Sequence, residues 1–86
     1  MRVLRAVADP IRLRALQLLV QRPRSTQELA PLLGIGEAGA SKHLRKLADA
    51  GLVTTRREGC YVVYSLAPGR VDAIAGALAA VLAGAG

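Results

Sequence analysis

The chain has 86 residues, which fits one small domain, and carries 12 Lys and Arg against 6 Asp and Glu, for a net charge of +6. Two tyrosines are its only aromatic residues, which disfavours the RNA and single-strand binding modules that stack bases on aromatic side chains. The charge favours a polyanionic partner such as nucleic acid, although a merely solvated basic surface gives the same composition.

A single cysteine, Cys60, cannot form an internal disulfide, so nothing indicates an oxidising compartment. The first residues lack the apolar core of a signal peptide, because arginines and Asp9 interrupt them. No stretch approaches the roughly 20 apolar residues of a membrane span. We therefore expect a soluble cytoplasmic protein.

Helical patterns fill the first part of the chain. Residues 1–8 predict the end of a short helix, and Asp9 followed by Pro10 predicts the N-cap of a second helix that runs to about residue 21. This second helix is apolar around most of its circumference, which predicts a central position. Arg12 lies between its apolar sectors, where an unpaired charge is costly. We expect a structural role for Arg12 with Asp49 or Glu28 as its partner, a phosphate contact being the alternative.

Residues 25–53 predict a helix-turn-helix. Ser25 and Glu28 have the spacing of a capping box that begins a helix ending near residue 33, and Gly34 to Gly36 supply a sharp turn. The helix from Glu37 to about residue 50 would be about 20 Å long, enough to lie in a DNA major groove about 12 Å wide. The residues of the first of these helices expected to face the core are Leu29, Leu32 and Leu33.

The helix from Glu37 separates an apolar face from a basic one. Ala40, Leu44 and Leu47 share one side of the helical wheel, and His43 lies on the border. The opposite half is the predicted DNA-reading surface. Its members are Ala38, Ser41, Lys42, Arg45, Lys46 and Asp49.

Residues 52–66 alternate like two short strands around a tip at Glu58 to Cys60, which predicts a two-stranded hairpin, or wing. Arg56 and Arg57 are placed at the base of this wing, within reach of a DNA backbone or minor groove. Cys60 has two interpretations: a redox-sensitive thiol near these arginines, or an incidental small residue in a turn.

A final helix is predicted over residues 70–83. One of its faces is an apolar stripe, and the other is almost uncharged, so both faces should be buried, one of them against a partner. A frayed, alanine-rich end is the alternative. The residues expected at a dimer interface are Leu4, Val71, Ile74, Leu78, Val81 and Leu82.

This order of elements predicts a single domain, 1–86, that is mainly α-helical with a small β-hairpin. With its motifs, the sequence resembles the ArsR/SmtB, or arsenic-repressor, family of winged helix-turn-helix transcriptional regulators. The resemblance implies a homodimer that binds double-stranded DNA at an operator and represses transcription until an inducer acts. The segments that carry it are LRAVADPIRLRAL (4–16), QELA (27–30), SKHLRKLADAGLV (41–53) and the wing (56–66). The family's DNA-contacting positions correspond here to Ser41, Lys42, His43, Arg45, Arg56 and Arg57, to which the charge pattern adds Lys46.

The chain departs from the family in its ligands and in its reading helix. The helix before the turn has no cysteine and the last helix has no histidine, whereas a thiolate or imidazole metal site needs three or four ligands. We therefore expect no metal or other cofactor, and an unknown inducer or partner. The first turn of the reading helix, Gly36 to Ala40, lacks hydroxyl groups, so phosphate contacts are better specified than base contacts.

Two other functional classes were weighed. A winged helix can also serve as a protein-interaction module without physiological DNA binding, and the weakly polar start of the reading helix favours that alternative. An enzyme is disfavoured because no nucleophile–base pair, carboxylate pair or phosphate-binding glycine loop is present. The short first helix leaves open whether the chain is a module of a longer protein.

Overall fold

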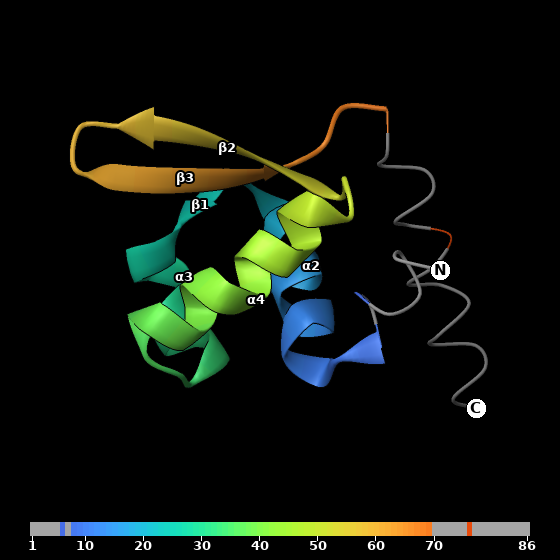
Figure 1. Cartoon of the computed structure of the whole chain (residues 1–86), viewed down its shortest axis with the longest axis horizontal. Coiled ribbons are helices and arrows are strands. Elements are labelled where there is room, and N and C mark those ends of the chain that lie inside the picture. The colour runs from blue at the N-terminus through green and yellow to red at the C-terminus, as the bar shows by residue number, and fades with distance from the viewer. Residues whose placement is uncertain (1–5, 7, 70–75, 77–86) are drawn as a thin grey trace.

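A cluster of helices carries an antiparallel sheet along one edge (Figure 1). The structure is a computed structural model that describes residue 6, residues 8–69 and residue 76. Its mainly helical architecture with a β-hairpin confirms the predicted winged helix-turn-helix. The described elements are α2 (Pro10–Gln21), β1 (Arg24–Ser25), α3 (Thr26–Leu33), α4 (Glu37–Asp49), β2 (Val53–Glu58) and β3 (Tyr61–Leu66).

Helix α2 begins and ends where the sequence predicts. The Asp9 carboxylate accepts hydrogen bonds from the backbone amides of Ile11 at 2.8 Å and Arg12 at 3.2 Å, so Asp9 is the N-cap. The helix contributes four buried side chains to the core, which confirms its central position. These are Ala15, Leu16, Leu18 and Leu19.

Arg12 is held by a backbone carbonyl. Its Nε donates to the carbonyl oxygen of Ala6 at 2.9 Å, which links α2 to the segment before it. Glu28, one of the two predicted partners, instead forms an ion pair with Arg22 at 2.8 Å. A carbonyl oxygen can serve a half-buried guanidinium because its fixed dipole accepts a hydrogen bond without needing a carboxylate.

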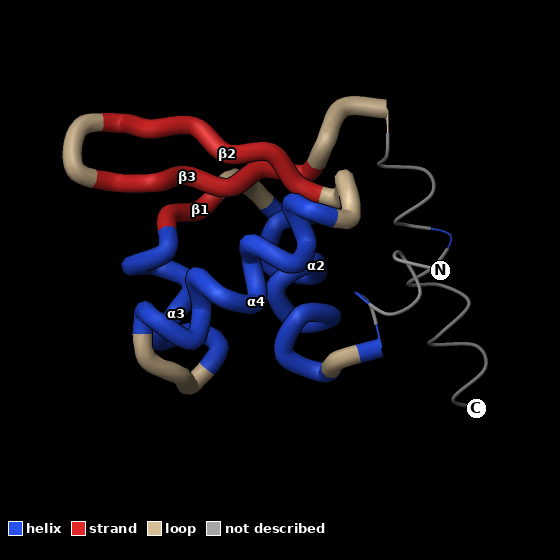
Figure 2. Tube along the Cα trace, viewed as in Figure 1, coloured by secondary structure: helices blue, strands red, loops and turns tan. Residues whose placement is uncertain are grey.

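The sheet has a third strand that the sequence did not indicate. β1 occupies a segment predicted as a loop and pairs antiparallel with β3, with Arg24 opposite Tyr64 and Ser25 opposite Val63. The strand order is β1-β3-β2, so β3 is central (Figure 2). The Arg24 guanidinium donates to the carbonyl oxygen of Leu18 at 3.1 Å, which fastens β1 to the end of α2.

Helix α3 begins with the predicted capping box. The Ser25 hydroxyl accepts from the Glu28 amide, and the Glu28 carboxylate accepts from the Ser25 amide, each at 3.1 Å. Gly34 ends the helix in the left-handed region, with φ +71°. The prediction that Leu32 faces the core was wrong, because this side chain is 47% exposed.

Leu32 is exposed because of its position on the helical wheel. Leu29 and Ala30 are buried and Leu33 packs partly against the core. These three residues span an arc of about 100°, and Leu32 lies about 100° from the centre of that arc at 3.6 residues per turn. Leucine identity alone did not reveal which side of α3 is covered.

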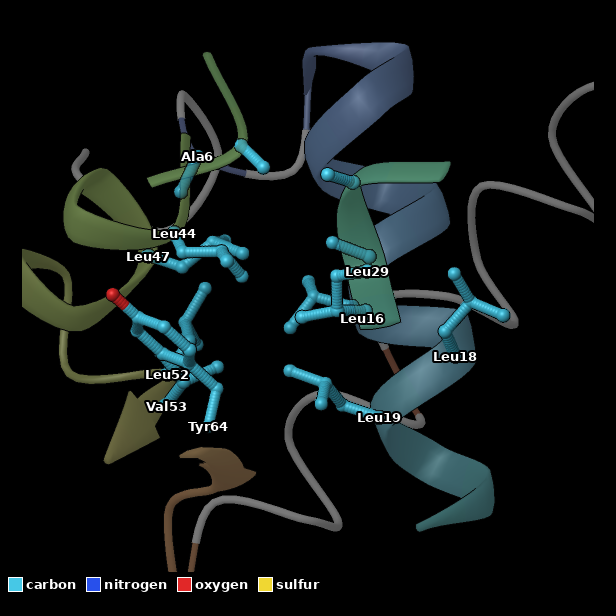
Figure 3. Close-up of a cluster of buried hydrophobic side chains, with 13 residues drawn as sticks. Ala6, Leu16, Leu18, Leu19, Leu29, Leu44, Leu47, Leu52, Val53 and Tyr64 are labelled. Atoms are coloured by element: carbon cyan, nitrogen blue, oxygen red, sulfur yellow. The ribbon is translucent and has the colours of Figure 1, made fainter. Parts of the chain in front are cut away.

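Five leucines fix the position of α4 in the fold. Leu44 and Leu47 of α4 are fully buried, and Leu52 follows the helix into the same core. Figure 3 shows these side chains on one side of the cluster and Leu16 and Leu29 on the other. The apolar side of α4 is thus packed, and its opposite side faces outward.

Two predicted regions lie largely outside the described residues. Ala6 and Ala8, which belong to the predicted first helix, are helical. Among the helices that the structure describes, none has the length and apolarity needed to cross a membrane. The predicted helix over 70–83 and all the predicted dimer-interface residues lie outside the described part, namely Leu4, Val71, Ile74, Leu78, Val81 and Leu82.

Candidate nucleic-acid interface

The outer side of α4 carries a cluster of exposed cations. Ala40 is buried on the inner side, as are Leu44 and Leu47 one and two turns further on. Lys42, Arg45 and Lys46 occupy the exposed side, as the helical period predicts. α4 crosses in front of α2 in Figure 1, so this basic side is not covered by the other described helices.

The cations of this surface have no internal partners. Lys42, Arg45, Lys46 and Arg57 make no hydrogen bond or ion pair with any residue that the structure describes. Their charges can therefore engage phosphates without first breaking a contact in the protein. We define these four residues as the free basic set.

Other arginines are already engaged. Arg22 pairs with Glu28, and Arg24 donates to the Gln21 side chain at 2.7 Å as well as to the Leu18 carbonyl. Net charge alone therefore overstates the charge that is available to a ligand.

The two wing arginines differ in position and in pairing. Arg56 lies opposite Val63 and Arg57 opposite Val62, so alternation along β2 directs their side chains to opposite faces. Arg57 shares the face that carries the buried Tyr64, toward the helices, whereas Arg56 forms an ion pair with Glu58. Both arginines lie beside the turn and not at the base of the hairpin, because β2 extends to Glu58.

His43 is turned toward the start of α2. Its Nδ1 lies 3.9 Å from the Asp9 carboxylate oxygen, and the two side chains are 24% and 30% exposed. This Nδ1 is itself buried and has no hydrogen-bond partner among the described residues. Ser41 is half-buried on the same helix. Both residues of the predicted DNA-contacting set are thus less accessible than the neighbouring cations.

Asp9 is a charged group at this site that sequence reasoning treated only as a helix cap. Burial tends to raise its pKa, but hydrogen bonds from the Arg12 and Ile11 amides and the positive charges of His43 and Arg12 outweigh burial. The net result is a lowered pKa, which keeps Asp9 ionised at neutral pH. The border position of His43 on α4 was the one signal that it could face another element.

The remaining candidate residue, Cys60, is an exposed free thiol in the hairpin turn beside Gly59. Within the described ranges, no three His, Cys, Asp or Glu side chains come together in a group that could hold a metal ion. A hollow between the start of α3 and the hairpin is lined by Glu28 and Glu58, whose carboxylates are already paired with arginines. This hollow therefore does not extend the basic surface.

Comparison with known proteins identifies the fold as a DNA-binding type. The family model described as a helix-turn-helix domain matches residues 7–56. The chain is 40% identical over 70 residues to the "Probable mercury resistance operon repressor" of Streptomyces lividans, covering 81% of this chain and 56% of that protein. The chain thus spans about half the length of the curated relatives it matches.

Solved structures agree with this assignment at the level of the fold. HlyU from Vibrio cholerae N16961 superposes with a TM-score of 0.80 at 35% identity, covering 90% of this chain and 84% of that one. The homodimeric winged helix-turn-helix DNA-binding domain of Mb0332 from Mycobacterium bovis, named as a possible ArsR-family regulator, superposes with a TM-score of 0.81 at 36% identity, covering 98% and 75%. The chain belongs to the ArsR/SmtB family of winged helix-turn-helix transcriptional regulators.

Proposed function

We propose that this chain binds double-stranded DNA as a homodimer in the cytoplasm and represses transcription. The observation that carries the proposal is the free basic set: three cations on the exposed side of α4 and Arg57 on the wing, none of them engaged by a described residue. A packed inner side and an unpaired basic outer side are what a helix needs to enter a major groove.

The proposed roles follow from accessibility. Lys42, Arg45 and Lys46 neutralise phosphates along the groove, and Arg57 adds a contact from the wing. Ser41 and His43 are half-buried and contribute at the border, while Arg56 contributes only if Glu58 releases it. The start of α4, where Gly36 is the N-cap without a side-chain hydrogen bond, offers few groups for base readout. Positioning on the backbone should therefore exceed base discrimination.

The proposed division of the chain assigns residues 25–53 to the helix-turn-helix, 52–66 to the wing and 70–83 to a dimerisation helix. The apolar stripe of the last helix and the homodimeric state of the Mycobacterium bovis domain support this division. In such a dimer the two reading helices meet half-sites about 34 Å apart, which is one turn of DNA.

We propose a non-metal inducer or a protein partner as the signal that releases DNA. The chain contains one Cys, one His and one Met, fewer than the three or four ligands that a soft-ligand metal site needs from a protomer. The proposed activity is therefore binding, without catalysis or a resident cofactor.

Charge reversal tests the proposal. Binding of a labelled duplex from the protein's own promoter region is measured by fluorescence anisotropy as salt is varied. With four cations per protomer engaged, the log–log salt slope for a dimer is on the order of −7. Lys42→Glu with Arg45→Glu should abolish binding, whereas Arg14→Glu, an exposed position on α2, should change it little. Retained binding in the α4 variant would favour the alternative, a winged helix that binds a protein partner.

A further inference from the structure

The contact between His43 and Asp9 joins the proposed reading helix to the start of α2. His43 is the only histidine of the chain, and it lies between Lys42 and Arg45, two members of the free basic set. Its Nδ1 is buried without a hydrogen-bond partner and faces the Asp9 carboxylate at 3.9 Å. An imidazole nitrogen in this position is directed into the protein and not toward a ligand on the outer side.

Asp9 is a rigid anchor for this contact. The same carboxylate oxygen that faces His43 accepts hydrogen bonds from the Ile11 and Arg12 amides, which fix it to the first turn of α2. Since α2 is the central helix of the core, a group bound to its N-cap is held relative to the whole fold. His43 can therefore set the orientation of the middle of α4, where the cations are.

We propose that His43 is a positioning residue for DNA binding: its protonated imidazole, held by the Asp9 carboxylate, fixes the basic side of α4, so that affinity for DNA decreases as pH rises and the imidazole loses its proton. This inference rests on the proposed function and adds a means of regulation to it.

The charges around the imidazole determine the sign. Asp9 faces it from the start of α2 and attracts the protonated form, and Arg12 lies on the same helix and attracts Asp9 in turn. On α4 itself, Lys42 is adjacent and Lys46 is one turn away, and both oppose the protonated form until phosphates neutralise them. Bound DNA and Asp9 therefore act in the same direction, toward the imidazolium.

A double-mutant cycle separates the effect of Asp9 from the effect of DNA itself. The four proteins are the wild type, Asp9→Asn, His43→Gln and the double variant. Asn is as good an N-cap as Asp, so Asp9→Asn keeps the cap while removing the charge. Lys46→Gln is the matched control, since it removes a cation from the same helix without touching the pair. Thermal unfolding verifies that each variant folds.

The readout is the Kd for the promoter duplex between pH 5.5 and 8.5 at constant ionic strength, because histidine titrates within this range. For the wild type we expect Kd to increase several-fold, up to roughly tenfold, which is the effect of one unit of linkage. Asp9→Asn should have a markedly flatter profile and His43→Gln a flat one, and the two changes should be non-additive at pH 6. Lys46→Gln should bind more weakly with an unchanged dependence on pH.

Two results would overturn the inference and leave DNA binding intact. One is a profile for Asp9→Asn that runs parallel to the wild type, since DNA phosphates alone would then account for the proton. The other is an additive double variant. Absence of wild-type binding at every pH would overturn the proposed function together with the inference.

Discussion

Arg56 and Arg57 are adjacent in sequence but lie on opposite faces of the β2–β3 hairpin. Arg57 is on the face toward the helices and has no described partner, whereas Arg56 is paired with Glu58 two residues along the same strand face. Two neighbouring cations that look equivalent in the sequence are therefore unequal candidates for contact with DNA.

Arg57→Ala should weaken binding to DNA more than Arg56→Ala. Loss of one phosphate contact per protomer reduces the magnitude of the salt slope of a dimer by about 2. Arg56→Ala should leave the slope nearly unchanged, because the ion pair with Glu58 already occupies that side chain. Anisotropy titrations at several salt concentrations measure both slopes. Equal losses for the two variants would contradict the assignment.

Leu47→Ala should destabilise the protein strongly. The Leu47 side chain is fully buried between α4 and the core, so its removal leaves a cavity and should cost about 2–5 kcal/mol of unfolding free energy. Leu32→Ala is the matched control, since Leu32 is 47% exposed and should cost well under half as much. Denaturant unfolding followed by circular dichroism gives both values. Similar costs would show that Leu32 is covered in solution.

Ser25→Ala should lower stability by about 1 kcal/mol. The substitution removes the hydroxyl that accepts from the Glu28 amide and leaves that donor without its partner at the start of α3. Ser25→Asp should recover most of the loss because Asp is also a good N-cap. Unfolding midpoints of the three proteins test this. An alanine variant as stable as the wild type would mean that water replaces the hydroxyl at no cost.

Stability should decrease on acidification below about pH 4, where carboxylates gain protons. The Ser25 amide, followed by the hydrogen bond from Arg22, lowers the pKa of Glu28, and the pKa of Asp9 is lowered as well. A lowered native pKa means that the unfolded chain binds protons first, so the stabilisation exists above the unfolded pKa and disappears as pH falls. Glu28→Gln should make the acid limb of the unfolding free energy less steep. An unchanged limb would exclude Glu28 as a contributor.

Local chemistry made most of the fold predictable. Asp9 with Pro10, the Ser25–Glu28 spacing and Gly34 each act within one turn of the chain, so the start of α2 and the bounds of α3 could be inferred from neighbours alone. β1 could not be inferred in this way. It is two residues long, too short to show alternation, and it forms only because β3 comes back beside it from about 40 residues further on.

The candidate site was predictable in position but not in pairing. The helical period placed Lys42, Arg45 and Lys46 on one side of α4, which the structure confirms. The contact of His43 with Asp9 joins residues 34 positions apart and depends on how α4 packs on α2, so no local pattern reveals it. The pairing of Arg56 with Glu58 was within reach, because residues two apart share a strand face.

β1 has a mechanical consequence for the wing. A hairpin attached by one strand would swing freely, but here β3 is hydrogen-bonded on both sides, and the residues that form β1 lead directly into α3. Force applied at the turn is therefore passed to the helix-turn-helix through two lines of hydrogen bonds. Each subunit should then meet DNA as one stiff body, and the adjustable quantity in a dimer is the distance and angle between its two copies.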